Sequence, residues 1–173
     1  MTTNLPEVWL RGPIEGVPAL LQPIAHALLE AVEEIKKITE GFPDAILWER
    51  PAGAASVGFH LQHVTGVLDR LSSYALNKPL SDAQMTYLKA EGKEIPVTTK
   101  QLVDQFEQRV ADMVEQLRTT NEASLTEHRS VGRKALPSTV IGLLSHSAEH
   151  TMRHTGQLLV TAKVVQYGNG LKQ

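Results

Sequence analysis

Five of the seven histidines in this chain lie in two stretches with helical spacing, and imidazole is a common ligand of transition metals. His60 and His63 are three residues apart, while His146, His150 and His154 follow one another at intervals of four. Residues at these spacings lie on neighbouring turns of one helix face, so two of them can bind the same ion. A third imidazole from a facing helix leaves a coordination position for water or substrate. The pattern predicts a three-histidine metal centre between two helices.

The absence of cysteine strengthens this interpretation. It excludes disulfides, thiolate metal ligands and a cysteine nucleophile, so a transition-metal site has to use histidine, aspartate or glutamate. The sequence also contains no recognisable nucleophilic triad and no glycine-rich phosphate-binding loop. The histidines are therefore the residues whose chemistry is most informative.

A helical wheel at about 100° per residue separates the three histidines of the second stretch. The apolar stripe of this stretch centres near Leu144 and Leu158. His154 lies beside the stripe, His150 lies a little further round, and His146 lies on the outer face. We therefore expect His150 and His154 to be the ligand pair and His146 to be a surface residue.

The first stretch leaves two alternatives on the wheel. His60 lies nearer the apolar centre of its helix and His63 lies at the flank, so either could face a cleft. The group His63, His150 and His154 is the predicted metal site, because spacing and wheel position agree for it. His60 is the candidate for a closing fourth ligand, which would indicate a structural ion instead of a catalytic one.

The elements that position these residues are predicted to be helices. Apolar residues recur at intervals of three and four in four long segments, at about 18–40, 56–77, 98–120 and 138–167. Ser56 is a good N-cap, and Ser81 with Gln84 can form a capping box that opens a short helix over 81–92. The segment between the last two long helices is predicted as a polar loop. We expect an all-α four-helix bundle with a short extra helix in the long connection between helices 2 and 3.

Composition limits the class of protein. The chain has 173 residues, of which 42% are apolar and 21% charged, and its formal net charge is −2. These values predict one globular domain over residues 1–173, with no basic surface for nucleic acid and no apolar run long enough for a membrane span. The first residues show no signal peptide, so we expect a cytoplasmic location.

Both histidine stretches resemble the DinB/YfiT-like superfamily of four-helix-bundle metalloenzymes. In SVGFHLQHVTGVLDRL, the family has a serine that opens the second helix and a ligand histidine seven residues later, which is His63 here. HSAEHTMRHTGQL is similar to the family ending H-x-x-x-H-x-G-Q, whose ligands fall on His150 and His154. The resemblance covers nearly the whole chain in helix order, and His60 and His146 lie outside its ligand pattern.

The resemblance implies a bound divalent metal, most often zinc or nickel, in an open site. Relatives include S-transferases that use bacillithiol or mycothiol, and a mycothiol-dependent isomerase. It also implies a homodimer, a small-molecule substrate and a low-molecular-weight thiol as co-substrate. The leading hypothesis is a metal-dependent transferase or hydrolase of the DinB-like type.

Other residues near the histidines have two interpretations each. Gln157 lies one turn beyond the last histidine and is expected either to orient water or substrate or to lie in a polar interface. Arg70 is expected to bind an anionic substrate group or to form a salt bridge. Glu149 is expected to point away from the site. Gly66 and Gly156 are expected to permit close helix packing.

Two other classes of protein compete with the enzyme hypothesis. One is a non-catalytic helical module that binds a metal or ligand, or dimerises, in a stress response. The other is a ferritin-like di-metal bundle, which needs a glutamate three residues before its ligand histidines. Ser147 and Thr151 occupy those positions, so the ferritin-like alternative is poor.

Overall fold

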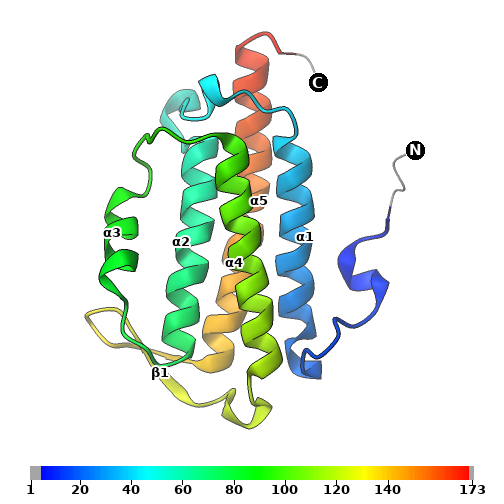
Figure 1. Ribbon diagram of the computed structural model, residues 1–173, viewed down its shortest axis with the longest axis vertical. Helices are drawn as coiled ribbons and strands as arrows, with labels where there is room; N and C mark the ends of the chain where they lie inside the picture. Colours follow the sequence, from blue (N-terminus) through cyan, green and yellow to red (C-terminus); the bar gives the residue numbers. More distant parts are fainter. Residues whose placement is uncertain (1–4, 172–173) are drawn as a thin grey trace.

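Four long helices run side by side and form the body of the protein (Figure 1). The computed structural model describes residues 5–171. The helices and strands are α1 (Gln22–Thr39), α2 (Val57–Ala75), α3 (Asp82–Ala90), α4 (Thr99–Thr119), β1 (His128–Val131), β2 (Leu136–Thr139) and α5 (Val140–Gly168). This confirms the predicted all-α bundle and its short extra helix, α3.

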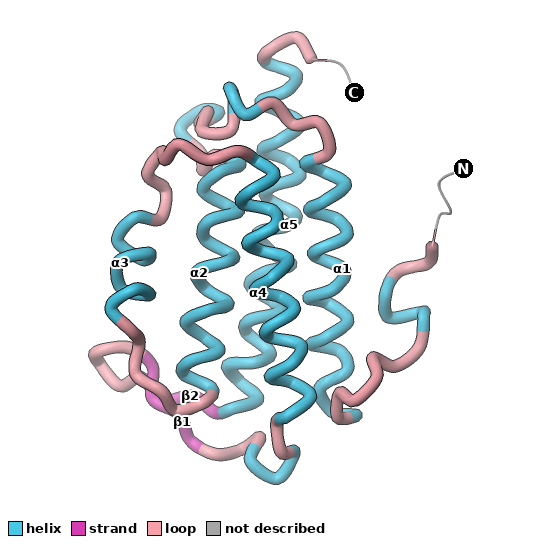
Figure 2. Tube along the Cα trace, in the orientation of Figure 1, coloured by secondary structure: helices cyan, strands magenta, loops and turns pink. Residues whose placement is uncertain are grey.

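The helices do not follow a simple up-down-up-down order. Both α1 and α2 pack against α4 and α5, so α1 and α2 lie diagonally opposite each other. Figure 1 shows α1 and α5 running in one direction and α2 and α4 in the other. Because α2 and α4 are parallel neighbours, the chain between them has to return along the length of the bundle. The helix α3 occupies this return and lies beside α2 (Figure 2).

The apolar positions that predicted the helices form the core. In α4, residues at intervals of three and four are buried, and Phe106 and Leu117 have no exposed surface. The matching stripes of the other long helices close around them, as expected for amphipathic helices. Among the described helices, none has both the length and the apolar composition needed to cross a membrane.

The predicted helix starts have the expected caps. The Ser56 hydroxyl accepts a hydrogen bond from the Phe59 backbone N–H at 3.1 Å. Ser81 and Gln84 form the reciprocal capping box at the start of α3. These bonds satisfy backbone donors that the first helical turn leaves without a partner.

The polar segment before α5 differs from its prediction as a loop. It contains a small antiparallel hairpin in which β1 pairs with β2, His128 opposite Thr139 (Figure 2). Each strand has four residues, and Pro137 lies in the second. Such short strands carry too little alternation to predict a sheet, and proline argues against one.

The helix α3 approaches α2 at Gly66. A Cβ atom at this position would lie 2.3 Å from Oε1 of Glu91 and 2.7 Å from Cε1 of Tyr87. The Tyr87 hydroxyl donates to the Gln62 carbonyl at 3.0 Å. This confirms the expected close packing at Gly66. The same expectation for Gly156 is wrong: apart from the adjoining residues and the α5 backbone around it, no heavy atom of the described residues lies within 4 Å of its Cβ position.

The two helical glycines should therefore respond oppositely to alanine. Gly66→Ala forces Glu91 and Tyr87 away from α2, so we expect a loss of about 1–3 kcal/mol in the free energy of unfolding. Gly156→Ala adds a helix-favouring residue in open space and should gain about 1 kcal/mol. Urea denaturation of both variants measures the difference. Equal effects of the two substitutions would contradict the close approach at Gly66.

Candidate metal centre

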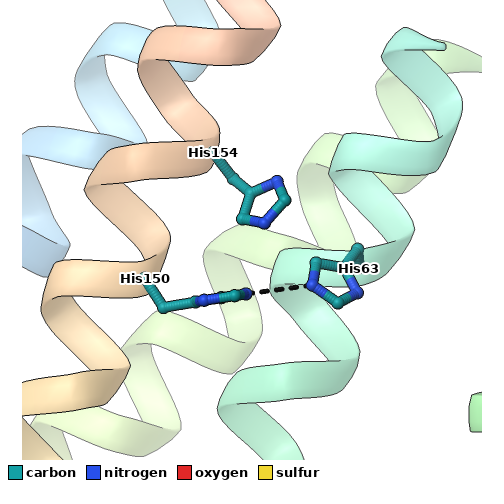
Figure 3. A group of neighbouring side chains, drawn as sticks. All are labelled: His63, His150 and His154. Carbon is teal, nitrogen blue, oxygen red and sulfur yellow. Dashed lines mark hydrogen bonds between the residues drawn. The ribbon is translucent and has the colours of Figure 1, made fainter. Parts of the chain in front are cut away.

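The structure brings His63 of α2 together with His150 and His154 of α5 (Figure 3). Their ring centroids lie 4.5 Å apart for His150 and His154, 4.6 Å for His63 and His154, and 5.1 Å for His63 and His150. One nitrogen from each ring lies within 4.8 Å of the other two. Within residues 5–171, this is the one group of three or more potential ligands gathered so closely.

His63 is held with one nitrogen turned toward the other two rings. Its Nδ1–H donates to Oε2 of Glu91 at 2.9 Å, and its Nε2 lies 2.9 Å from Nε2 of His150. Phe59 stacks on the ring with a centroid distance of 5.2 Å and an interplanar angle of 11°. The carboxylate fixes the proton on Nδ1, which leaves the Nε2 lone pair available to an ion.

Glu91 was not predicted as part of the site. It caps the C-terminus of α3, 28 residues from His63, and its side chain is only 8% exposed. Its other oxygen accepts a hydrogen bond from Arg70 at 2.5 Å. Burial favours the neutral acid, but the hydrogen bonds from His63 and Arg70 hold the pKa of Glu91 below its ordinary value. Gly66 makes room for this carboxylate. A glycine inside a helix indicates only indirectly that another side chain lies close to that point of α2.

Arg70 therefore forms the salt bridge that was one of its two predicted roles. Its guanidinium is bonded to Glu91, and its side chain is 11% exposed. Together the two residues make a compact ionic pair behind His63. Arg70 acts on the histidine centre through Glu91.

His60 lies behind His154 and outside the group of three. The Nδ1 atoms of the two rings lie 3.0 Å apart, and His60 is 4% exposed. Burial, followed by the neighbouring His63, lowers the pKa of His60 to about 4. Burial, followed by His63 and His150, lowers the pKa of His154 to about 4. Both rings are thus neutral near pH 7, the form in which imidazole binds metals.

His150 completes the group, and His146 does not join it. Burial, followed by His63, lowers the pKa of His150, whose Nδ1 is buried with no hydrogen-bond partner among the described residues. His146 is exposed, with Nδ1 3.3 Å from a carboxylate oxygen of Glu149. Glu149 is also bonded to Arg153. The predicted outward positions of His146 and Glu149 are therefore confirmed.

The three imidazoles fit a divalent ion. Two nitrogens bound to a tetrahedral zinc at 2.0–2.1 Å lie about 3.3 Å apart, which is within the range of separations in this group. Two of the rings have a partner on their second nitrogen, as is usual for metal ligands. The described residues supply three donors, which leaves a position for a ligand from outside the chain.

Comparison with protein families gives the same assignment as the histidine motifs. The chain matches the family model of the DinB superfamily over residues 24–158. It belongs to the DinB superfamily. The matched part of this DinB-superfamily chain includes all three clustered histidines and Glu91. A comparison with curated proteins finds no match.

Loss of the Glu91 charge should weaken metal binding. Glu91→Gln keeps the size of the side chain but removes the carboxylate that orients His63, so we expect the affinity for Zn²⁺ to fall by about tenfold or more. Competition with a chromophoric chelator measures this. Tyr87→Phe is the matched control, because it removes a contact between α3 and α2 without touching His63. Equal zinc affinity in Glu91→Gln and the parent would contradict the orienting role.

The metal-free protein should lose stability in mild acid. His60 and His154 stay neutral in the folded state down to pH about 4, whereas both titrate near pH 6.5 in the unfolded chain. The unfolded state therefore binds more protons as the pH falls from about 6.5 to 4, and we expect a loss of about 2–4 kcal/mol over this window. Urea denaturation at pH 7, 6, 5 and 4 tests it. His60→Gln should flatten the profile, and a flat profile in the parent would contradict the prediction.

Proposed function

We propose that His63, His150 and His154 bind one divalent metal ion, with zinc or nickel as the ion, and that the protein is a metal-dependent enzyme. The observation that carries this proposal is the convergence of three imidazoles from α2 and α5 within 4.8 Å. Imidazole ligands suit both metals. Three neutral ligands with an open position are typical of catalytic zinc.

The side chains around the centre prepare it for this chemistry. A divalent ion bound by three neutral imidazoles lowers the pKa of a bound water to about 7 or holds a thiol as its thiolate. Glu91 keeps the proton of His63 on Nδ1, and His60 faces the Nδ1 of His154. Burial lowers the pKa of His150 and of His154, so these two rings are uncharged near pH 7. The chain's own residues therefore orient the ligand rings and keep protons off the nitrogens that would bind the metal.

An enzyme is favoured over a structural ion because none of the described residues joins the three histidines as a fourth ligand. His60, the candidate for that role, faces His154 through Nδ1 instead of joining the group of three. Glu91 is bonded to His63 and Arg70. Because both neighbours have other partners, a substrate or water can complete the coordination.

We further propose thiol-dependent S-transfer as the reaction, with hydrolysis as the second candidate. The chain has no cysteine, so the sulfur has to come from a low-molecular-weight thiol. In this reaction the thiol would lose its proton to solvent, and its sulfur would bond to an electrophilic carbon of the small molecule as that carbon's bond to a leaving group breaks. A homodimer, a cytoplasmic location and a single domain over residues 1–173 stay predictions.

Substitution of the ligands should remove the metal and leave the bundle intact. We expect His150→Ala and His154→Ala to lower bound zinc from one ion per chain to none, because the apolar core does not depend on these rings. Metal content by elemental analysis and helix content by circular dichroism measure the two effects. His146→Ala, at an exposed position, is the control that should keep its zinc. Unfolding of both ligand variants would show that the ion is structural.

The zinc-loaded protein should also conjugate an electrophile with a low-molecular-weight thiol. Loss of this conjugation in His150→Ala would link it to the histidine centre. Ester hydrolysis without conjugation would favour the hydrolase, and absence of both activities would favour the non-catalytic module.

A further inference from the structure

The histidine face of α5 continues past the metal centre into a pocket. His150, His154, Gln157 and Thr161 follow at intervals of four, three and four, so they lie along one face of the helix. The last two line a pocket of about 530 Å³ between α5 and the start of α2. The α5 groove, as we name this pocket, is lined by Ala54, His60, Arg153, Gly156, Gln157 and Thr161.

His60 connects the groove to the metal centre. It lines the groove and also faces His154 through Nδ1 at 3.0 Å. A molecule in the groove would therefore be one side chain away from the three imidazoles. None of the three imidazoles is among the residues that line the groove, so a substrate that spans both sites would have to pass His60.

A glycine keeps the groove open at a position where no neighbouring side chain requires glycine. Gly156 lies inside α5, where glycine is less favourable than alanine, and no heavy atom lies within 4 Å of its Cβ position. Gly66 differs, because a close neighbour requires it. The space over Gly156 is the part of the groove that a side chain would fill. Its openness points to a ligand.

Arg153 gives the groove its charge preference. Arg153 is the cationic side chain among the residues that line the groove. The Arg153 guanidinium bonds Glu149 through Nη2, so its other edge can still bind a carboxylate. Gln157 offers an amide beside it, and the exposed Val160 offers apolar contact. These groups suit an aliphatic chain that ends in a carboxylate.

We propose that the α5 groove binds the carboxylate-bearing end of the substrate, an aliphatic small-molecule acid whose other end reaches the histidine centre. Arg153 pairs with the carboxylate and Gln157, one turn further along α5, hydrogen-bonds to it, while Thr161 lines the far end of the groove. That the other end of the acid reaches the histidine centre rests on the proposed function. Binding of a carboxylate in the α5 groove does not depend on the metal and can be tested with metal-free protein.

Hexanoate and hexanol are a matched pair of probes for the groove, because they differ only in the charged end. In NMR titrations of the metal-free protein, we expect hexanoate to shift the amide signals of Gly156 and Gln157 with a Kd at least fivefold below that of hexanol. Arg153→Gln should remove this preference, and Glu149→Gln should increase it by releasing the guanidinium. Gly156→Leu, which introduces a helix-favouring residue, should abolish both sets of shifts by filling the groove.

Equal affinity for the two probes, or shifts confined to other parts of the protein, would overturn the proposal. The link to the metal centre is tested separately with zinc-loaded protein and mercaptohexanoate, which should bind at least tenfold more tightly than hexanoate. Equal binding of these two acids would overturn the spanning substrate but not the carboxylate site. Failure of the protein to bind zinc would overturn the proposed function and leave the hexanoate result unaffected.

Discussion

The antiparallel packing of α2 against α5 is the constraint on which the site depends. It places polar imidazoles between two packed helices, where an unpaired buried polar group is costly. His60 and His154 offset this cost by hydrogen-bonding to each other, and His63 offsets it by hydrogen-bonding to Glu91. The same burial lowers the pKa of His60 and His154 to about 4. Their packing thus keeps these rings in the uncharged form that can bind a metal ion.

A second layer of contacts comes from the segment between α2 and α4. Glu91, at the end of α3, reaches the same turn of α2 that carries His63, and Gly66 gives it space. Gln62 is buried on this turn and accepts a hydrogen bond from the Gly92 backbone N–H at 2.9 Å. The connection is therefore bonded to α2 at several points around one metal-ligand candidate. Stability of α3 and orientation of His63 are coupled through these bonds.

Sequence periodicity was sufficient for the helices and for the pairing of His150 with His154, but it left His60 and His63 as alternatives on α2. Spacings of three and four determine which residues share a face, so the relation of His150 to His154 follows from α5 alone. Glu91 could not be found this way, because it lies 28 positions after His63 and their contact depends on how the chain after α2 folds back. Gly156 was misinterpreted for a related reason. A glycine in a helix indicates unused space, and only the neighbours show whether a helix or a ligand occupies it.

The direction of α4 has a consequence for how this scaffold can diversify. Because α2 and α4 are parallel neighbours, the connection over residues 76–98 has to run back along α2 whatever its sequence. That obligatory passage brings exchangeable side chains alongside the histidines, while the four-helix core remains the same. Replacing residues 82–92 would change the side chains that contact His63 and leave the packing of the four long helices the same.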